Sequence, residues 1–586
     1  MKKSVLGKIW YPTKIEEDMV TRISRDLQIS DFLARLVSTR VSSSEDAFNF
    51  LDPKIKTLLP NPFHLLDMQK GAERIVKAIK TKEKICIFAD YDVDGATSSA
   101  LLKNILRELK IEAEIYVPDR IEEGYGPTSA AMQKIKDNDT KLLITVDCGS
   151  VAFDALLHAS DIGLDVIVID HHISLDKLPK AIAVINPNRI DETSDYKNLA
   201  AVGVAFLFAV AFCSILKKEM FFENNSIKHP DLIKQLDIVA LGTVCDVMTL
   251  TGLNRAFVKQ GLKIAQSRSN IGYATLCDVA NLQEAINCYH LGFVLGPRIN
   301  AGGRVGTSSL GAALLSTNNS QKAQKLSEEL SEHNNNRKLI ELTILEEAHK
   351  AAKLQAKNAV IFVAGKGWHP GVIGIVAGRL KETYNRPVAV IAVNDGIGKG
   401  SCRSIKGCDF GAALIEANLN SILIAGGGHS MAAGFTIEES KLNILQEFLE
   451  NRFEAILKNS TTHLEEFYDL DLISSAVNEN LIEEINKLEP FGNGNPSPVF
   501  KFDNLFVLKA DIVGGSHIKV QFVPTRDAYS SRSLNAIAFN SMNTLLADVI
   551  LSKKPYDLSV IGSLKVNSWQ NRQTVQLQIK DLIIQS

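Results

Sequence analysis

Three apolar, strand-like runs in this chain are each followed directly by residues whose side chains can bind metal ions. The apolar runs lie at 84–89, 141–146 and 164–169. The residues that follow these runs are Asp90, Asp92, Asp94, Asp147, Asp170, His171 and His172. In a parallel α/β sheet the carboxyl ends of the strands meet at one crevice, where ligands bind. The pattern therefore predicts a parallel sheet with these seven side chains gathered at one edge.

Carboxylates held so close together repel one another unless cations neutralise them. The cluster therefore predicts two divalent metal ions. A ligand set rich in carboxylates and free of cysteine favours Mn²⁺ or Mg²⁺ over a structural zinc. A single aspartate at a strand end is often a helix N-cap or a turn residue, and a histidine pair can be a hydrogen-bonded loop. Three such strand ends in one domain favour the metal site.

The spacing of these residues suggests how they share the ions. Asp92 and Asp94 lie two residues apart, so their side chains leave an extended segment on the same side and can each hold one ion. Asp147 stands alone at its strand end and is suited to bridge both ions. His171 and His172 leave an extended backbone on opposite sides, so we expect one to bind metal while the other faces the substrate.

The motifs Asp-Tyr-Asp-Val-Asp-Gly at 90–95, Val-Asp-Cys-Gly at 146–149 and Asp-His-His at 170–172 resemble the ordered motifs of the DHH phosphoesterase superfamily. The chain beyond them resembles the RecJ branch of that superfamily, the single-strand-specific exonucleases. The resemblance covers nearly the whole chain and continues at 118–120, 124–126, 241–247, 296–304 and 426–434. It implies a 5′-to-3′ exonuclease that degrades single-stranded DNA to 5′-mononucleotides in recombination and mismatch repair.

The resemblance also implies roles for the metal ligands. Asp92 would serve one ion, and the ligands of the other would be Asp94, His171 and Asp246. Many superfamily members have a histidine four residues before the first ligand aspartate, where this chain has Phe88. One ion would then be bound more weakly, or Asp90 or water would take that position.

Three further residues are assigned to the catalytic step. By resemblance, His172 would contact the scissile phosphate and Asp170 would orient the histidines. Asp90 is placed with them, and its role is the least defined of the three. An activated water would attack the phosphorus in line, expel the 3′ oxygen and leave a 5′-phosphate.

A second group of residues is expected to bind the phosphates of the substrate. Residues 367–371, 398–404 and 426–429 predict three polar, glycine-rich turns, none of which is a Walker A loop. Glycines let a phosphodiester approach the backbone, although such glycines are also common in ordinary turns. By resemblance, this region is the DHHA1 domain, a second jaw that closes on the substrate. The expected substrate-binding residues are Arg298, Asn300, Arg304, Ser401, Arg403, Gly427, Gly428 and His429.

A chain of 586 residues is too long for one hydrophobic core, so several domains are expected. The predicted fold class is α/β, with two α/β lobes joined by a long helix and followed by an OB-like β barrel. The expected parts are an N-terminal segment, the DHH catalytic domain, a connecting helical region, the DHHA1 domain, a linker helix and a single-strand-binding domain. Their boundaries are 1–67, 68–256, 257–357, 358–457, 458–494 and 495–586.

Local patterns predict individual elements within these parts. Residues 321–357 predict one long helix whose polar middle, 331–337, is solvated. The apolar stretch 199–216 predicts a buried helix and not a membrane span. Strands are expected in the second lobe near 358–364, 387–393 and 421–425. Five more are expected near the C-terminus, at 499–508, 517–523, 534–539, 558–566 and 574–584. These five suit an OB fold or another small barrel, and the resemblance favours the OB fold.

Composition gives only weak information about the partners. The net charge of −2 gives no global argument for nucleic-acid binding. Eight scattered cysteines without a Cys-x-x-Cys pair, and an N-terminus without an apolar signal segment, predict a cytoplasmic protein without a membrane anchor. The resemblance implies single-stranded DNA as substrate, and single-strand-binding protein and a RecQ-type helicase as partners. We expect a monomer.

Two other classes of function compete with the exonuclease. One is a superfamily phosphodiesterase that acts on short oligonucleotides or cyclic dinucleotides, or a pyrophosphatase. An enzyme with a small substrate does not need the additional N-terminal segment or the C-terminal β domain, so this class is disfavoured. The other is a non-catalytic nucleic-acid-binding relative, which the intact ligand set argues against.

Overall fold

The structure of the protein is a computed structural model that describes residues 2–119, 123–124, 126–459, 464–524, 533–552, 554–569 and 572–585. The chain divides into two compact units. The core unit comprises Asn61–Asp246 and Gly261–Thr461, and the terminal unit comprises Met1–Pro60, Val247–Gln260 and Thr462–Ser586. The six-part division expected from the sequence remains a prediction.

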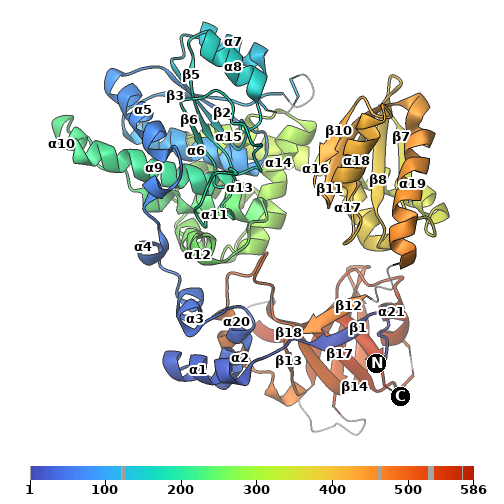
Figure 1. Cartoon of the computed structure of the whole chain (residues 1–586). Helices are drawn as coiled ribbons and strands as arrows, with labels where there is room; N and C mark the ends of the chain where they lie inside the picture. Colours follow the sequence, from blue (N-terminus) through green and yellow to red (C-terminus); the bar gives the residue numbers. More distant parts are fainter. Residues whose placement is uncertain are drawn as a thin grey trace. The chain divides into compact units, whose positions relative to one another are not determined.

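The first lobe of the core unit is built on a five-stranded parallel sheet with the order β3-β2-β4-β5-β6 (Figure 1). Its strands are β2 (Ile85–Ala89), β3 (Ala113–Tyr116), β4 (Leu142–Val146), β5 (Asp165–Ile169) and β6 (Ala183–Ile185). Nearly every strand residue in the middle of the sheet is buried, as expected when helices cover both faces.

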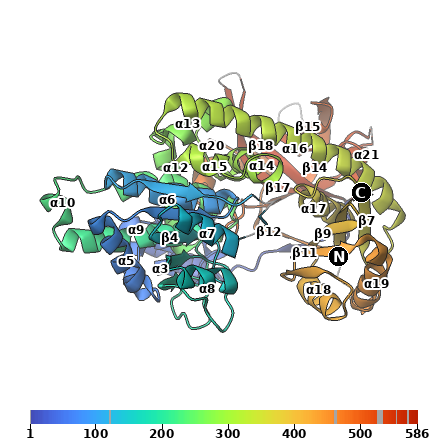
Figure 2. The same ribbon diagram turned by 90° about the horizontal axis from the view of Figure 1, so that it is seen from above.

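Helices cover both faces of this sheet. On one face, α7 (Ser129–Asp137) and α8 (Phe153–Asp161) pack against the apolar side chains of β2, β4 and β5. On the other face lie α5 (Met68–Thr81), α6 (Val93–Glu108) and α9 (Ala201–Lys218). In the view of Figure 2, β4 accordingly lies between α6 and α8.

Helix α9 is the apolar segment that the sequence predicts to be a buried helix. By length and composition alone it could cross a membrane, and it is the one such helix among the described residues. Most of its side chains are buried inside the first lobe, including Phe206, Phe208 and Phe212. A core helix explains its composition.

More helices follow along the chain and lead to the second lobe. They are α10 (Phe221–Asn224), α11 (Leu236–Cys245), α12 (Gly252–Gln266), α13 (Ile271–Val279), a π-helix (His290–Leu295), α14 (Gly296–Val305), α15 (Leu310–Leu315) and α16 (Ser320–Leu354). Helix α16 is the predicted long helix and runs for 35 residues.

The expectation of a solvated middle in α16 holds only in part, since Glu332, Asn335 and Asn336 are exposed but two neighbouring polar residues are not. Asn334 and Arg337 are buried there. Arg337 Nη1 donates to Glu341 Oε2 at 2.6 Å, and Arg379 Nε of the second lobe approaches Glu341 Oε1 at 2.6 Å. These polar residues are buried because they neutralise one another and join α16 to the second lobe.

The second lobe is a five-stranded mixed sheet with the order β10-β11-β9-β8-β7. Its strands are β7 (Ile361–Lys366), β8 (Val388–Asn394), β9 (Ile397–Arg403), β10 (Ala425–Gly428) and β11 (Ala432–Glu438). Its helices are α17 (Ile373–Tyr384), α18 (Phe410–Leu419) and α19 (Leu442–Asn459). Figure 1 shows this sheet in yellow and orange, with α18 and α19 beside it.

Two of the three predicted glycine-rich turns are strands. Residues 398–403 belong to β9 and residues 426–428 belong to β10, whereas the strand expected at 421–425 begins only at Ala425. Gly400 pairs with Phe435 of β11, and a Cβ on Gly400 would lie 2.1 Å from the Phe435 ring. The glycine is needed because the ring of the neighbouring strand covers it, a device that lets glycine sit inside a sheet.

The terminal unit contains the predicted C-terminal barrel. Its strands are β14 (Phe500–Val513), β15 (His517–Val523), β16 (Leu534–Ala538), β17 (Leu558–Trp569) and β18 (Arg572–Ile584). They follow the order β14-β15-β16-β18-β17, and β17 pairs with β14 to close the ring. All five expected strands are present. The predicted fold class, with two α/β lobes, a long helix and a barrel, is confirmed.

The N-terminal helices share the core of the barrel. Val20 of α1 (Glu17–Leu27), Leu33 of α2 (Asp31–Ser38) and Phe50 of α3 (Ser44–Leu51) lie in one cluster with barrel residues such as Phe502. In the same unit, β1 (Ile9–Pro12) pairs with β12 (Glu465–Tyr468). The remaining elements are α4 (Ile55–Leu58), β13 (Leu470–Asp471), α20 (Glu479–Asn486) and α21 (Leu545–Ile550).

Candidate metal centre

The register of the parallel sheet places four polar residues side by side. Ala89, Val146, Ile169 and Ile185 are partners across β2, β4, β5 and β6, so the next residue of each strand lies at the same level. These next residues are Asp90, Asp147, Asp170 and Asn186. The backbone ladder continues through them, because each aspartate N–H donates to the last carbonyl of the neighbouring strand at 2.9–3.3 Å.

Asp92 caps a helix and does not lie in an extended segment. Its Oδ1 accepts hydrogen bonds from the N–H groups of Asp94 at 2.8 Å and Gly95 at 3.2 Å. Helix α6 therefore begins at Val93, and Asp94 lies in its first turn. The expectation that Asp92 and Asp94 leave an extended backbone on one side is wrong, because a helix starts between them.

Asp94 is buried against the start of a second helix. Its Oδ2 accepts a hydrogen bond from Ala201 N at 2.6 Å, and its Oδ1 accepts one from Val202 N at 2.9 Å. These amides are the first two of α9, whose own N-cap residue, Ala200, has no side-chain oxygen. Asp94 therefore satisfies the free N–H groups of α9 and complements the positive end of its dipole.

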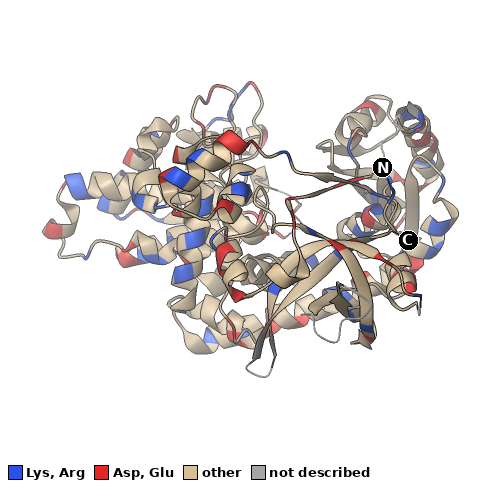
Figure 3. Cartoon of the chain, turned by 90° about the horizontal axis from the view of Figure 1, so that it is seen from below, with Lys and Arg blue, Asp and Glu red and all other residues tan. Residues whose placement is uncertain are grey.

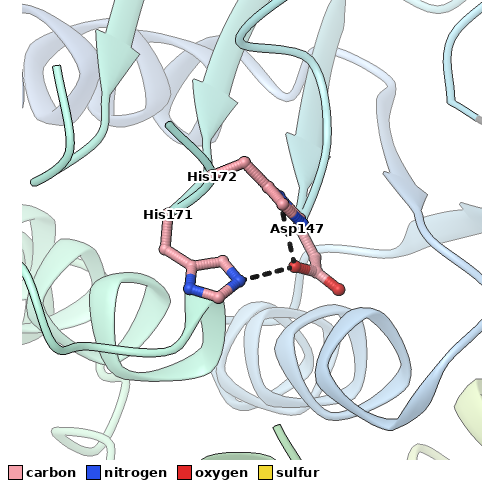
Figure 4. Close-up of side chains that lie close together, drawn as sticks. All are labelled: Asp147, His171 and His172. Atoms are coloured by element: carbon pink, nitrogen blue, oxygen red, sulfur yellow. Dashed lines mark ion pairs between the residues drawn. The ribbon is translucent and has the colours of Figure 1, made fainter. Parts of the chain in front are cut away.

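Both histidines are directed toward the same carboxylate (Figure 4). His171 Nε2 lies 3.3 Å from Asp147 Oδ1, and His172 Nδ1 lies 3.9 Å from that oxygen. The expectation that the two side chains point to opposite sides is wrong. The backbone is turned here, because Asp170 Oδ1 accepts hydrogen bonds from the N–H groups of both histidines at 2.8 and 3.2 Å.

Two asparagines that are not among the predicted site residues hold this turn. Asn186 Nδ2 donates to His172 O at 2.8 Å, and Asn188 Nδ2 donates to His171 O at 2.5 Å. Asn186 follows the strand-like run 181–185, so the rule that identified the aspartates could also have identified it. No comparable local signal marks Asn188.

Asp170 and His172 form a charged pair. Asp170 Oδ1 lies 2.8 Å from His172 Nδ1. Burial alone would lower the pKa of His172, but the hydrogen bond and the charge of Asp170 outweigh it and raise that pKa to about 9. Burial would raise the pKa of Asp170, and the same partner instead holds it well below its usual range. His172 is therefore protonated at neutral pH and carries its proton on Nδ1 toward Asp170.

His171, by contrast, is neutral. Burial and the positive charge of His172 lower the pKa of His171 to about 4. Its close approaches to Asp147 and to Asp246 Oδ2, which is 3.5 Å from Nε2, are therefore not ion pairs at neutral pH. A neutral imidazole nitrogen among carboxylates is the form of histidine that binds metal.

The remaining carboxylates have difficulty ionising together. Burial, followed by the charges of neighbouring aspartates, raises the pKa of Asp94 and of Asp147 well above the usual value. The same causes raise the pKa of Asp246, which follows α11, to about 7. Asp147 Oδ1 and Asp246 Oδ2 are also buried and accept no hydrogen bond from the described residues. Divalent cations would neutralise the repulsion and would also give these two buried oxygens a partner.

Three sets of potential ligands can each surround one ion. They are Asp90 with Asp92 and Asp147, Asp94 with His171 and Asp246, and Asp147 with His171 and His172. In each set the ligand atoms lie within 4.8 Å of one another. Asp147 and His171 each belong to two sets. The residues present therefore fit a centre with more than one divalent ion.

Phe88 lies away from this cluster. It is fully buried in the core beneath α7 and α8, and its ring stacks on Tyr116 with centroids 5.5 Å apart. A side chain at this position therefore belongs to the sheet's packing. Asp90, two residues later and just past the end of β2, is the acidic residue of this segment that lies with Asp92 and Asp147.

Helix α14 lies directly against the metal-ligand segments. A Cβ on Gly303 would lie 2.9 Å from Tyr91 O, between Asp90 and Asp92, so only glycine fits there. Of the predicted substrate-binding residues on α14, Asn300 is half-buried and Arg304 Nη1 donates to Gly371 O of the second lobe at 3.2 Å. Arg298 contacts the protein itself, since its Nη1 donates to Val294 O at 2.6 Å.

The second lobe gathers a separate group of polar residues. Ser401 and Arg403 lie on β9, and Arg403 Nη1 donates to Ser401 Oγ at 3.4 Å. A Cβ on Gly374, in the first turn of α17, would lie 3.0 Å from Ser401 Oγ and 3.4 Å from Arg403 Nη2. Burial lowers the pKa of Arg403. A helix N-terminus, a hydroxyl and a desolvated guanidinium at one place suit an anionic phosphate.

Three other predicted residues lie nearby in the sequence of the second lobe. Gly427 and Gly428 belong to β10, and His429 is exposed in the turn that follows. His429 N donates to Ala432 O at 2.8 Å, which closes that turn. Arg120 and Tyr125, which belong to motifs in the resemblance, lie outside the described residues.

The charged residues drawn in Figure 3 do not separate into a basic and an acidic group along the described helices. Figure 3 shows basic and acidic residues interspersed along the helices. With a net charge of −2, a long-range positive field does not attract a polyanion. A polyanionic ligand would therefore have to be held by local groups such as Arg403.

Three family models match the chain. The model described as DHH family, N-terminal domain, matches residues 84–243, and the DHHA1 domain matches residues 356–455. The RecJ OB domain matches residues 468–581. These matches include the strand-end aspartates, the polar group of the second lobe and the barrel.

Relatives match over nearly the whole length. The single-stranded-DNA-specific exonuclease RecJ of Bacillus subtilis is 32% identical in an alignment 586 positions long, which covers 98% of this chain and 71% of that protein. The protein of the same name from Salmonella typhimurium is 33% identical and covers 97% of this chain and 98% of its own. The crystal structure of RecJ from Thermus thermophilus in complex with Mn²⁺ is 26% identical, with a TM-score of 0.81, over 99% of this chain and 80% of that one.

Proposed function

The chain belongs to the RecJ family of DHH phosphoesterases, and on this premise we propose that it is a metal-dependent exonuclease that degrades single-stranded DNA. The observation that carries the proposal is the group of buried aspartates and a neutral histidine at level strand ends, whose mutual repulsion divalent cations would remove. The relatives are named single-stranded-DNA-specific exonucleases. Solved T. thermophilus relatives hold Mn²⁺ or Mg²⁺, which are the cofactors we expect here.

We assign the ions to two overlapping ligand sets. Asp90, Asp92 and Asp147 would hold one ion. Asp147, His171 and Asp246 would hold the other, because His171 Nε2 lies within 3.5 Å of an oxygen of each aspartate. Asp147 would then bridge the two ions, as the sequence suggests. In this assignment Asp90 is a metal ligand, whereas the sequence groups it with the catalytic residues His172 and Asp170.

Asp94 receives a supporting role in this assignment. The resemblance implies that Asp94 is a ligand, and Asp94 lies close enough to Asp246 and His171 to serve as one. Both of its oxygens, however, already accept hydrogen bonds from the first amides of α9. We propose that Asp94 mainly positions the start of α6 against α9, so that Asp92 is held at the edge of the cluster.

The chemistry follows from this arrangement. When bound, the two ions would lower the pKa of a water molecule and neutralise the charge of the scissile phosphate. Asp170 holds His172 protonated and oriented through Nδ1, so Nε2–H can donate to a phosphate oxygen in the transition state. Ser401, Arg403 and the first turn of α17 would bind a second phosphate of the strand. Cleavage would expel the 3′ oxygen and release a 5′-mononucleotide.

The biological setting is proposed on family membership alone. We propose a cytoplasmic protein that acts in recombination and mismatch repair as a monomer. Single-strand-binding protein and a RecQ-type helicase are the partners that we expect. The closed barrel would bind the strand beyond the cleaved nucleotide.

Strands labelled at one end test the proposal. With Mn²⁺, a 5′-labelled single strand should release labelled mononucleotide at once, whereas a 3′-labelled strand should shorten progressively. Duplex DNA and cyclic dinucleotides should be poor substrates, and a chelator should stop the reaction. Release of mononucleotides from the 3′ end first, or a preference for dinucleotides over long strands, would contradict the proposed activity.

A further inference from the structure

An exposed pair of aromatic residues lies on the helical segment that leads into α14. Tyr289 is 62% exposed and Phe293 is 73% exposed. Their rings stack on each other, with centroids 5.4 Å apart and an interplanar angle of 24°. Large aromatic side chains dominate the energetics of cores and interfaces, so two of them side by side in solvent indicate a surface that a partner covers.

A π-helical turn presents this pair. His290–Leu295 is π-helical and continues directly into α14. Single π turns inside helices occur frequently at functional sites. Other side chains of the same segment hold the turn. Nε2 of the buried His290 lies 3.0 Å from Glu284 Oε1, and Arg298 Nη1 donates to Val294 O at 2.6 Å. The segment is therefore anchored while both rings remain in solvent.

The same segment packs against the metal-ligand segments. Cys245, which precedes the ligand Asp246, approaches Leu291 O with its Sγ at 3.4 Å. A Cβ on Gly296 would lie 2.5 Å from the same sulfur. Further along, Gly303 of α14 lies against Tyr91, between the ligands Asp90 and Asp92. The element that carries the aromatic pair therefore contacts two of the segments that supply carboxylates to the centre, those of Asp90–Asp92 and of Asp246.

We propose that Tyr289 and Phe293 form a stacking surface for the bases of the single strand that enters the metal centre. This inference rests on the proposed function. Every base has a π face, so stacked rings can hold a strand without reading its sequence, as a nuclease without sequence preference requires. Without a global positive charge on the protein, stacking provides affinity that phosphate contacts alone do not.

The test is the double variant Tyr289→Ala/Phe293→Ala in the full-length protein. Its affinity for a long single strand should fall about 5- to 150-fold, the range expected for lost base stacking. Its metal content and its cleavage of a dinucleotide should stay unchanged, because neither residue is a ligand. Phe293→Trp should keep the affinity and Phe293→Leu should lose it. Phe48→Ala, at a phenylalanine of α3 that is 54% exposed, is the matched control and should bind as the wild type does.

Strands with one abasic site, moved stepwise from the 5′ end, locate the contact. The wild type should lose affinity at one or two positions, and the double variant should lose nothing further there, because both changes remove the same contact. The salt dependence of binding should not change, since stacking releases no counterions. An equal abasic profile for the double variant and the wild type would refute the stacking surface and leave a protein partner as its occupant. Equal loss of dinucleotide cleavage would show a structural role instead.

The outcome is separable from a failure of the proposed function. If the wild type does not degrade single strands with Mn²⁺, the proposed function itself is wrong. If the wild type degrades them and the double variant does so equally well at limiting strand concentration, only the stacking surface is wrong.

Discussion

Replacing Asp246 by asparagine should abolish cleavage and yet stabilise the metal-free first lobe. Burial and the charge of Asp92 raise the pKa of Asp246 from 3.8 to about 7. At about 1.4 kcal/mol per pKa unit, this shift is an upper limit of about 4 kcal/mol. The Asp246 side chain is 24% exposed, and screening and shared protons reduce the value to about 1–3 kcal/mol. Asparagine has nearly the same shape as aspartate, so the substitution isolates the cost of the charge.

The same shift gives the pH dependence of the metal-free wild type. Because the pKa of Asp246 is higher in the folded state than in the unfolded state, the folded protein binds more protons at intermediate pH. Stability should therefore fall as the pH rises from about 4 to about 7 and then level off. Asp246→Asn should flatten this decline. Saturating Mn²⁺ should also remove it from the wild type, by binding the folded state alone.

Hydrogen exchange of peptides from α11 is the suitable assay, because it reports the local stability of this lobe. At pH 8 with chelator, α11 of Asp246→Asn should exchange about 5- to 150-fold more slowly than that of the wild type, which is the same free energy expressed as a ratio. With Mn²⁺ the order should reverse, because the variant lacks a ligand. Asp237→Asn is the matched control. Asp237 is a buried residue of the same helix whose pKa burial also raises to about 7, and it lies in none of the ligand sets.

Asp237→Asn should change the exchange of α11 by the same factor with and without Mn²⁺. A metal-free Asp246→Asn protein that exchanges faster than the wild type at pH 8 would refute the reasoning. It would mean that the carboxylate is stabilising without a cation, and that repulsion within the cluster is not the reason for binding one.

Three other predictions follow from the structure. Arg403→Ala and His429→Ala should weaken substrate binding without loss of metal. The loss for Arg403→Ala should be about 1.5–3 kcal/mol, as for a charge-assisted contact. If both variants bind the substrate as tightly as the wild type does, this part of the second lobe has a structural role only. Gly303→Ala should shift α14 from Tyr91, slow cleavage and lower the stability by about 1–3 kcal/mol. Gly378→Ala in α17, where a Cβ meets nothing within 4 Å, should change neither property. Cleavage kinetics and thermal unfolding test both variants. Removal of residues 495–586 should weaken the binding of long strands and reduce the salt dependence of that binding, while short oligonucleotides are still cleaved. Circular dichroism should show partial loss of helix, because α1–α3 lose the barrel core. Unchanged binding of long strands would assign the barrel another role.

The sequence was most informative where the fold is regular. Each strand-like run that ends in an aspartate became a buried parallel strand, because apolar runs on this scale are covered on both faces. The register of the sheet then brought Asp90, Asp147 and Asp170 to one level. The five barrel strands were also recognisable, since each contains an alternating or apolar run next to turn residues.

Some errors are local, because Asp92 caps α6 and Asp170 turns the backbone of the two histidines. The other errors concern contacts between residues far apart in the chain. Asp94 bonds to amides more than a hundred residues away, and the turn of His171 and His172 is held by Asn186 and Asn188. The glycines of β9 looked like a turn because the ring that covers Gly400 comes from Phe435. Such partners are set by tertiary packing, and local spacing contains no information about them.

A titration of the metal-free protein with Mn²⁺ tests whether the strand-end aspartates and His171 hold two divalent ions that act on single-stranded DNA. Bound ions and cleavage of a 5′-labelled single strand are measured in the same samples. The wild-type chain should bind two ions, with cleavage appearing as the second ion binds. A folded Asp147→Ala variant should bind at most one ion and should not cleave the strand. If this variant retains two ions or full activity, Asp147 does not bridge a two-ion centre.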